Sequence, residues 1–148
     1  MSFFDFFKMD SHSKETEKAK QEAQAALIKA AETLNIDVAV MAHDNWKLRL
    51  ETYLTGKSQE DLRPEVVCCD ERCDLGKWIY GDGEAHLGQY MTFQDLKATH
   101  KMFHYTASSV VTLSQAGKQD EAHELLHGEF SKLSTTVKRR LHDLKALL

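Results

Sequence analysis

Apolar residues recur at helical spacing along most of the chain. In the N-terminal third they follow one another every three or four positions, which is the period of an amphipathic α-helix. This first stripe comprises Ala19, Ala23, Ala26, Ala30, Leu34, Val38 and Met41. Ser11 or Ser13 suits the helix N-cap, and no glycine or proline interrupts residues 11–55. We therefore expect one helix that runs on to Gly56 with at most a kink near residues 35–37.

A second stripe begins near this kink and ends before Gly56, a plausible helix C-cap. Its members are Ile36, Val40, His43, Leu50 and Leu54. His43 therefore lies on an apolar face, with Trp46 one turn away. A buried histidine needs a partner for its ring nitrogens, so His43 is a candidate for more than packing.

The middle of the chain is less regular. Residues 57–72 are charged, contain the single proline and predict a loop. Asp70 can then cap a short helix that carries Cys73 to Tyr80 and ends at the Gly81–Gly83 turn. Within it, Cys73, a glycine pair and a tryptophan fall inside nine residues, Cys-Asp-Leu-Gly-Lys-Trp-Ile-Tyr-Gly. The chain has no other concentration of special residues like this one.

Two further amphipathic helices complete the pattern. Thr92–Asp95 resembles a capping box that opens the next helix, and Gly117 ends it. Its inner face comprises Phe93, Leu96, His100, Phe103, His104, Ala107 and Val111. The last helix begins near Asp120, with the stripe Ala122, Leu126, Phe130, Leu133, Val137, Leu141, Leu144 and Leu148. These elements predict an all-α protein, a four-helix-type antiparallel bundle with a short cysteine-bearing helix and an N-terminal helical extension.

Composition narrows the function classes. The 148 residues carry a formal charge of −4 without a dominant basic stripe, so nucleic-acid binding is not expected. Every window of 18 residues contains a charge, which predicts no membrane span. The first ten residues lack a cationic start, and Asp5 and Lys8 interrupt their apolar run, so we expect no signal peptide. Three cysteines in such a chain favour a reducing compartment, the cytoplasm.

His100 and His104 carry the chemistry. Residues at i and i+4 project from one helix face, as a metal site needs, and here that face is apolar. Either histidine alone would be read as a hydrogen-bonded core residue. For the pair, with core-facing His43 and a cysteine available, the balance favours a metal site. Three imidazole nitrogens and one thiolate suit Zn²⁺ in a closed tetrahedron, and cobalt or copper would bind the same set in vitro.

These residues resemble a known family. His43, then Cys73 in Cys-x-Leu-Gly-x-Trp-x-Tyr-Gly, then His100-x-x-x-His104 is similar in order and interval to the chemoreceptor zinc-binding (CZB) domain, over roughly residues 36–144. The resemblance implies a bacterial cytoplasmic sensory module that commonly forms a homodimer. It also implies that His43, Cys73, His100 and His104 bind zinc and that Cys73 senses oxidants such as hypochlorous acid. Gly76 and Trp78 would seat the short helix.

The residue pattern and the resemblance together predict the domain organisation, and a departure from the family's architecture bears on the output. Residues 36–148 would form the zinc-binding helical bundle. Residues 1–35 would form an extension for pairing or docking, with a start rich in phenylalanine (Phe3, Phe4, Phe6 and Phe7) and an alanine-rich helix. The chain lacks a chemoreceptor signalling region and a cyclase domain, so we expect a stand-alone form. It would act in trans on a protein partner, such as a chemoreceptor or diguanylate cyclase of chemotaxis or cyclic-di-GMP pathways, or buffer zinc.

Two other functions would use the same four residues. A purely structural zinc bundle that serves in dimerisation or docking is the second hypothesis. A zinc hydrolase is the third and least favoured, because four protein ligands leave no open position and no His-Glu-x-x-His motif is present. We therefore do not expect the protein to be an enzyme.

Other metal-binding and redox-active residues stay open as well. His123 and His127 form a second i, i+4 pair, read mainly as polar surface. The adjacent Glu-x-x-His would need a second copy to make a di-iron site. Cys68 and Cys69 are read as loop thiols, with a resolving role for oxidised Cys73 left open.

Overall fold

The structure, a computed structural model, describes residues 14–148, and this part of the chain is helical without a strand. The predicted all-α class is therefore confirmed. In chain order the elements are α1 (Lys14–Ala31), α2 (Ile36–Leu54), α3 (Pro64–Val67), α4 (Asp74–Trp78), the kinked segment η2 (Ile79–Gly83), in which Gly81 is not helical, α5 (Glu84–Leu87), α6 (Met91–Gln115), α7 (Gln119–Leu125), the π-helical turn η3 (Leu126–Phe130) and α8 (Ser131–Ala146).

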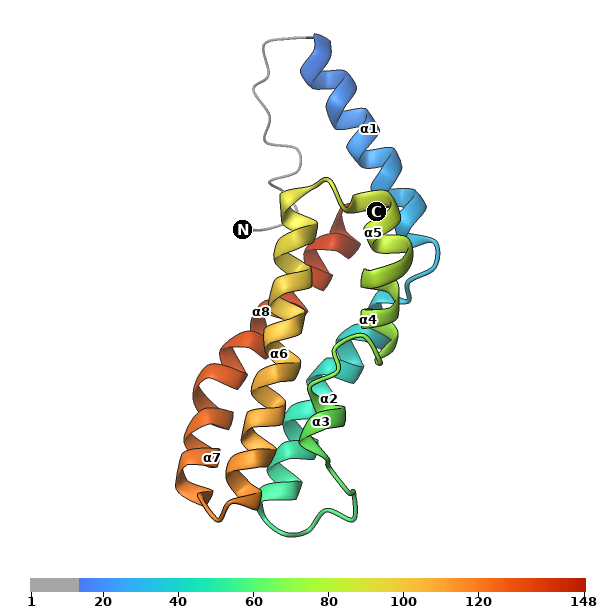
Figure 1. Cartoon of the computed structure of the whole chain (residues 1–148). Coiled ribbons are helices and arrows are strands. Elements are labelled where there is room, and N and C mark those ends of the chain that lie inside the picture. Colours follow the sequence, from blue (N-terminus) through green and yellow to red (C-terminus); the bar gives the residue numbers. More distant parts are fainter. Residues whose placement is uncertain (1–13) are drawn as a thin grey trace.

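Four antiparallel legs build the bundle (Figure 1). Helix α2 runs down the view, the broken segment from α3 to α5 returns upward, α6 runs down again, and α7 with α8 returns. Helix α1 precedes α2, and its first turns extend past the upper end of the bundle. The predicted four-helix-type bundle is thus built with one leg made of short pieces, and this leg carries Cys73.

The predicted uninterrupted helix up to Gly56 is wrong. Helix α1 ends at Ala31, and Asn35 adopts an extended conformation (φ −85°, ψ 97°) in which its side chain accepts a hydrogen bond from the Val38 amide. An N-cap of this kind starts a new helix, because it satisfies an amide that has no helical partner. The first apolar stripe therefore does not continue in space, and Val38 and Met41 are 49% and 70% exposed.

Two further local predictions need correction. Cys73, not Asp70, is the N-cap of α4, since its sulfur accepts the Gly76 amide. No capping box opens α6: the helix begins at Met91 after Tyr90, and the Thr92 side chain is buried, with no hydrogen-bond partner for its hydroxyl among the described residues.

The residues between α2 and α4 are less irregular than predicted. The expected loop at residues 57–72 contains helix α3, with Pro64 in its first turn, where a missing amide hydrogen costs nothing. The predicted helix ends at Gly56 and Gly117 are confirmed by their positive φ angles of 74° and 78°.

The predicted inner faces form the core. All seven residues expected to line the inner face of α6 are buried, the two histidines among them. Helices α7 and α8 are joined through η3 without a break, and Phe130, Val137 and Leu141 of this helical run are fully buried. Leu148, predicted to end that stripe, is 55% exposed.

Helix α1 shares this core. Leu27 and Ala30 are buried in the same hydrophobic cluster as α2, α6 and α8. The division into residues 1–35 and 36–148 stays a prediction, and the four N-terminal phenylalanines lie outside the described residues. Within residues 14–148, no helix combines the length and apolar character needed to span a membrane.

Candidate metal centre

Four side chains from three legs of the bundle converge at one point. They are His43 of α2, Cys73 at the start of α4, and His100 and His104 of α6, and their donor atoms all lie within 4.8 Å of one another. The Cys73 sulfur is 3.3 Å from Nε2 of His100, 3.6 Å from Nε2 of His104 and 3.9 Å from Nε2 of His43. The structure thus brings together the four residues singled out from the sequence. That each of them binds zinc stays a prediction.

The helices that carry the histidines direct their side chains into the site. His100 and His104 are one turn apart on the buried face of α6, and their ring centroids are 4.6 Å apart. His43 comes from the buried face of α2 and also touches Phe103, which closes the apolar side of the site. All three imidazoles are at most 3% exposed, so water does not satisfy them.

Backbone carbonyls fix the orientation of two histidine rings. Nδ1 of His43 donates to the Ala39 carbonyl at 2.7 Å, and Nδ1 of His104 donates to the Val67 carbonyl at 3.1 Å. Since a carbonyl only accepts, both rings carry their proton on Nδ1 and present the Nε2 lone pair to the site. Nε2 of His43 lies 3.0 Å from Nε2 of His100, a separation that needs a proton or a cation between the two nitrogens.

The third ring has a different outer partner. Nδ1 of His100 is buried without a hydrogen bond in the described structure, and the nearest acceptor is Asp70 Oδ2 at 4.0 Å. Asp70 is itself buried and accepts a hydrogen bond of 2.7 Å from the Tyr80 hydroxyl. Burial and this bond raise the pKa of Tyr80 to about 12, so it stays a donor at neutral pH. Asp70 is therefore placed to orient His100 once a cation takes Nε2.

Asp70 was missed as a site residue, because the sequence pattern made it a helix cap. The only available signal was its position three residues before Cys73 and ten before Tyr80. Neither spacing has a general meaning. Tyr80, the tyrosine of the Cys73 motif, donates the hydrogen bond that holds the Asp70 carboxylate in place.

Cys73 has two structural roles. Its sulfur faces the histidines and also accepts the Gly76 amide at 3.3 Å as the cap of α4. A side chain on Gly76 would overlap the Asp70 carbonyl oxygen, so only glycine lets this segment fold against the helix start. Trp78 Nε1 donates to the Ala30 carbonyl at 2.8 Å and so ties α4 to α1. These contacts are compatible with a supporting role for Gly76 and Trp78, which stays a prediction.

Electrostatics favour neutral ligands in the metal-free site. Burial lowers the pKa of His100 to about 2 and that of His104 to about 4, with the neighbouring imidazoles adding to the effect on both. Burial also lowers the pKa of His43, against its bond to Ala39. The same burial raises the pKa of the Cys73 thiol. The site is poorly suited to protons and well suited to a cation that takes lone pairs.

The donor set fits zinc. Zinc–nitrogen bonds of about 2.0 Å and zinc–sulfur bonds of about 2.3 Å give tetrahedral edges of roughly 3.3 Å between nitrogens and roughly 3.5 Å between nitrogen and sulfur. The nitrogen pair at 3.0 Å and the sulfur–nitrogen distances of 3.3–3.9 Å lie close to these edges. Three imidazoles and one thiolate would fill the tetrahedron, which supports the predicted Zn²⁺ cofactor.

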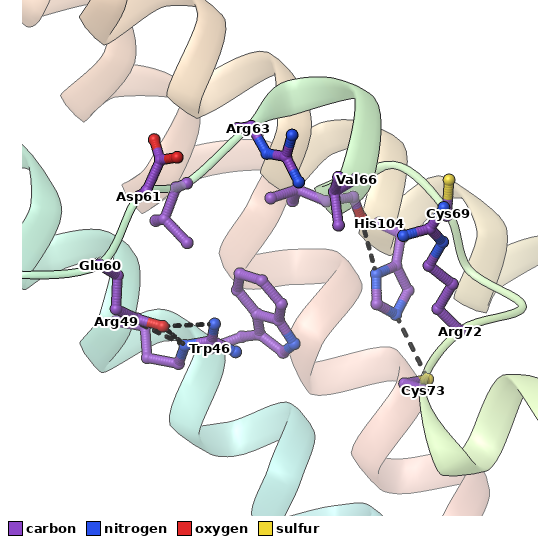
Figure 2. Close-up of a pocket in the computed structure, with 12 residues that line it drawn as sticks. Trp46, Arg49, Glu60, Asp61, Arg63, Val66, Cys69, Arg72, Cys73 and His104 are labelled. Atoms are coloured by element: carbon purple, nitrogen blue, oxygen red, sulfur yellow. Dashed lines mark hydrogen bonds and ion pairs between the residues drawn. The ribbon is translucent and has the colours of Figure 1, made fainter.

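A cavity of about 430 Å³ opens beside this centre (Figure 2). Cys73 and His104 form part of its wall, and Trp46 and Arg49 of α2 form another part. The Arg49 guanidinium lies 3.8 Å from the centre of the Trp46 ring and binds both carboxylate oxygens of Glu60. Cys73 is therefore reachable from outside, whereas the histidines are buried.

The remaining candidates do not join the centre. His123 and His127 are exposed and parallel, with ring centroids 6.2 Å apart, and no third ligand joins them in residues 14–148. Cys68 and Cys69 both face the Glu65 carbonyl, with sulfur–oxygen distances of 3.6 and 3.2 Å.

Comparison with known proteins agrees with the geometry. Residues 43–111 match the family model described as the chemoreceptor zinc-binding domain. The match begins at His43 and extends beyond His104, so it contains all four converging residues, and it is shorter than the span from 36 to 144 expected from the motifs. Neither the curated proteins nor the solved structures contain a match to the chain.

Proposed function

Because residues 43–111 form a chemoreceptor zinc-binding domain, we propose that the chain is a zinc-binding sensory module of bacterial signalling that acts on a partner protein in trans. The input would be the zinc level or oxidation of the zinc-bound thiolate. One observation carries the proposal: a buried His₃Cys cluster includes a cysteine that also caps a short helix. A change at this sulfur changes the metal site and the start of α4 together.

The proposed ligands are Nε2 of His43, His100 and His104 and the sulfur of Cys73. Bound zinc would stabilise the Cys73 thiolate against the burial that favours the thiol. His43 and His104 are held in the required tautomer by Ala39 and Val67. With four protein ligands the metal would have no open position, so we expect no catalysis.

Oxidation would act on Cys73 because it is the only one of the four that bears a thiol. A two-electron oxidant such as hypochlorous acid would transfer one oxygen to the thiolate, giving a sulfenic acid while chlorine leaves as chloride. The sulfur loses two electrons and its ligand character. Cys73 would then no longer tether the start of α4 to α2 and α6.

Two contacts would transmit this change to α1. The Trp78 indole donates to the Ala30 carbonyl at 2.8 Å, and the Thr33 hydroxyl donates to Asp82 at 2.7 Å. Both join the segment after Cys73 to the end of α1 and the turn after it. Movement of α4 would therefore alter the end of the bundle from which α1 extends, the surface we propose for the partner.

We place the module in the cytoplasm and expect the partner to be a chemoreceptor, a diguanylate cyclase or a similar protein of chemotaxis or cyclic-di-GMP pathways. A second candidate function is a structural zinc bundle for dimerisation or docking. Exposed Met41 and Leu48, 70% and 60% accessible and two turns apart on α2, favour contact with a second copy of the chain. A homodimer is compatible with both functions.

Zinc stoichiometry tests the ligand assignment. We expect about one zinc per chain in the wild type and at least a tenfold loss of zinc affinity in Cys73→Ala, because the only thiolate ligand is gone. Cys68→Ala and Cys69→Ala are matched controls that should bind zinc like the wild type. Elemental analysis and competition with a chelating dye give the two quantities. Equal zinc binding in all three variants would show that Cys73 is not a ligand.

Zinc removal separates the two candidate functions. A sensory module should lose or change partner binding, or its oligomeric state, when a chelator removes zinc or an oxidant modifies Cys73. A retained fold with unchanged partner binding after both treatments would contradict the sensory function. That result would support the structural function instead.

A further inference from the structure

We propose that the cavity beside Cys73 is a docking site for a small thiol that carries carboxylate groups, and that this thiol forms a mixed disulfide with oxidised Cys73. The inference rests on the proposed function, because it begins from a Cys73 that an oxidant has reached. It adds the chemical class of the molecule that resolves the oxidised state.

Access is direct. The cavity of about 430 Å³ falls in the size range of small-molecule sites, about 300–1,000 Å³. Apolar side chains of Leu62, Val66 and Val67 line it together with Trp46, and Cys73 stands at one end next to His104 (Figure 2). A bound molecule can thus place an atom against the Cys73 sulfur without opening the histidine core.

The charged side chains that line the cavity favour a negatively charged ligand. Three arginines line the cavity, Arg49, Arg63 and Arg72. The charge of Arg49 is balanced by Glu60 through a bidentate ion pair of 2.7–3.1 Å. Across residues 14–148, the Arg63 and Arg72 side chains form no ion pair or hydrogen bond, and Asp61 is the one other acidic residue of the lining. Guanidinium groups of this kind bind carboxylates bidentately, so the cavity favours a carboxylate-bearing ligand.

The chain offers Cys73 no thiol partner in contact. Within hydrogen-bonding range its sulfur meets the three imidazoles, the Asp70 carbonyl and the Gly76 amide, and no second sulfur. Cys68 and Cys69 instead face the Glu65 carbonyl at the end of α3. Cys69 lines the same cavity, but its sulfur points away from Cys73 (Figure 2), so a thiol from outside can reach the oxidised Cys73 without a rearrangement of the chain.

The reaction is balanced as follows. The docked thiolate attacks the sulfur of the Cys73 sulfenic acid, a sulfur–sulfur bond forms, and hydroxide leaves and takes a proton to become water. The sulfenic sulfur is reduced while the incoming thiol is oxidised. The two-electron oxidant that made the sulfenic acid is the one named for the proposed function.

Glutathione, a tripeptide thiol with two carboxylates, is the probe. Zinc-loaded wild-type protein is treated with one equivalent of hypochlorous acid and then with glutathione, and the adducts are mapped by mass spectrometry. We expect one glutathione adduct on Cys73. Adducts confined to Cys68 or Cys69, or a disulfide between one of them and Cys73, would overturn the inference.

Substitutions then test the charge. In a Cys68→Ala/Cys69→Ala background, Arg63→Gln/Arg72→Gln should slow adduct formation with glutathione about three- to tenfold, because two attractive charges are removed. The same change should leave the rate with neutral 2-mercaptoethanol unaltered and raise the rate with cationic cysteamine. Arg139→Gln, an exposed arginine of α8 outside the cavity, is the matched control. Equal slowing of all three thiols would contradict a docking role.

A second arm separates this inference from the proposed function. Zinc-free reduced protein is mixed with glutathione disulfide, which is itself the oxidant: its exchange with the Cys73 thiolate gives the same mixed disulfide and releases one reduced glutathione, without hypochlorous acid or a sulfenic acid. If hypochlorous acid yields no sulfenic acid on Cys73 but this exchange still depends on Arg63 and Arg72, the proposed oxidant response fails and the docking site stands. If the exchange ignores both arginines, the docking site is refuted.

Discussion

At the scale of single residues, the centre is defined by which atom of each ring is free. His43 and His104 have no choice, because a backbone carbonyl takes the Nδ1 proton of each. His100 has a choice between a proton on Nε2, shared with His43, and a proton on Nδ1, facing Asp70. A metal would decide it. Asp70 would then stabilise the metal-bound state through the ring that no carbonyl holds.

Replacing Asp70 tests this role. We expect Asp70→Asn to weaken zinc binding about 10–100-fold, because an amide orients and polarises the His100 ring less than a carboxylate does. The measurement is the zinc dissociation constant from chelator competition. Glu71→Gln, a charge change at the exposed neighbouring residue, should leave the constant within about twofold. Equal effects of the two substitutions would mean that Asp70 acts only through its charge.

At the scale of elements, α4 is short and held at both ends. Its first residue is preceded by the Cys73 cap, and its last residue, Trp78, reaches the Ala30 carbonyl of α1. A helix of five residues is not stable alone, so these end contacts decide whether it forms. A change at the Cys73 end of α4 is therefore expected to alter the contact that Trp78 makes at the other end.

Trp78→Phe tests the coupling. The phenyl ring keeps most of the packing with Phe93 but loses the indole donor, so we expect a loss of about 1–3 kcal/mol in the free energy of unfolding. Amide exchange in the second half of α1 should also quicken. Trp46→Phe is the matched control, since Trp46 is half-buried at the cavity, where its ring packs against that of His104. Unaltered exchange in α1 after Trp78→Phe would argue against this route for the signal.

At the scale of the whole molecule, the residues of the metal site destabilise the fold when no metal is bound. Three buried imidazoles sit in the centre of an otherwise apolar bundle, and one of their nitrogens has no partner in the described structure. Zinc binding would convert this cost into a link between α2, α4 and α6. The bundle should therefore be markedly more stable with zinc than without it.

The pH dependence of the metal-free protein follows with a definite sign. In the folded chain burial lowers the pKa of His43, that of His104 to about 4 and that of His100 to about 2. In the unfolded chain histidines protonate near pH 6.5, so below that pH the unfolded state binds more protons. The free energy of unfolding should fall as the pH drops from about 7.5 to about 5.5.

Urea denaturation of chelator-treated protein across this range measures the effect. His100→Gln should show a shallower slope with pH than the wild type, because it lacks one of the groups that protonate only on unfolding. A metal-free protein that is equally stable, or more stable, at the lower pH would contradict the described burial of the histidines.

The sequence by itself determined the all-α class, the buried faces of the helices and the set of four chemistry-bearing residues. It could do so because helical period and i, i+4 spacing are local properties, readable over a turn or two. The assignment of Cys73 came from the resemblance of residues 73–81 to the family motif, not from helical spacing. The break between α1 and α2 was missed because the apolar period continues through it, while the Asn35 cap depends on a single side-chain bond.

Only the tertiary structure decided how these residues work together. The tautomers depend on carbonyls such as Val67, which is 37 residues from His104. The role of Asp70, the bond from Trp78 to α1 and the cavity beside Cys73 likewise arise from packing between separate legs of the bundle. Contacts across such distances are set by the balance of the whole core. No local sequence pattern predicts these contacts. They determine which molecules can reach Cys73 and which parts of the bundle move when its sulfur is modified.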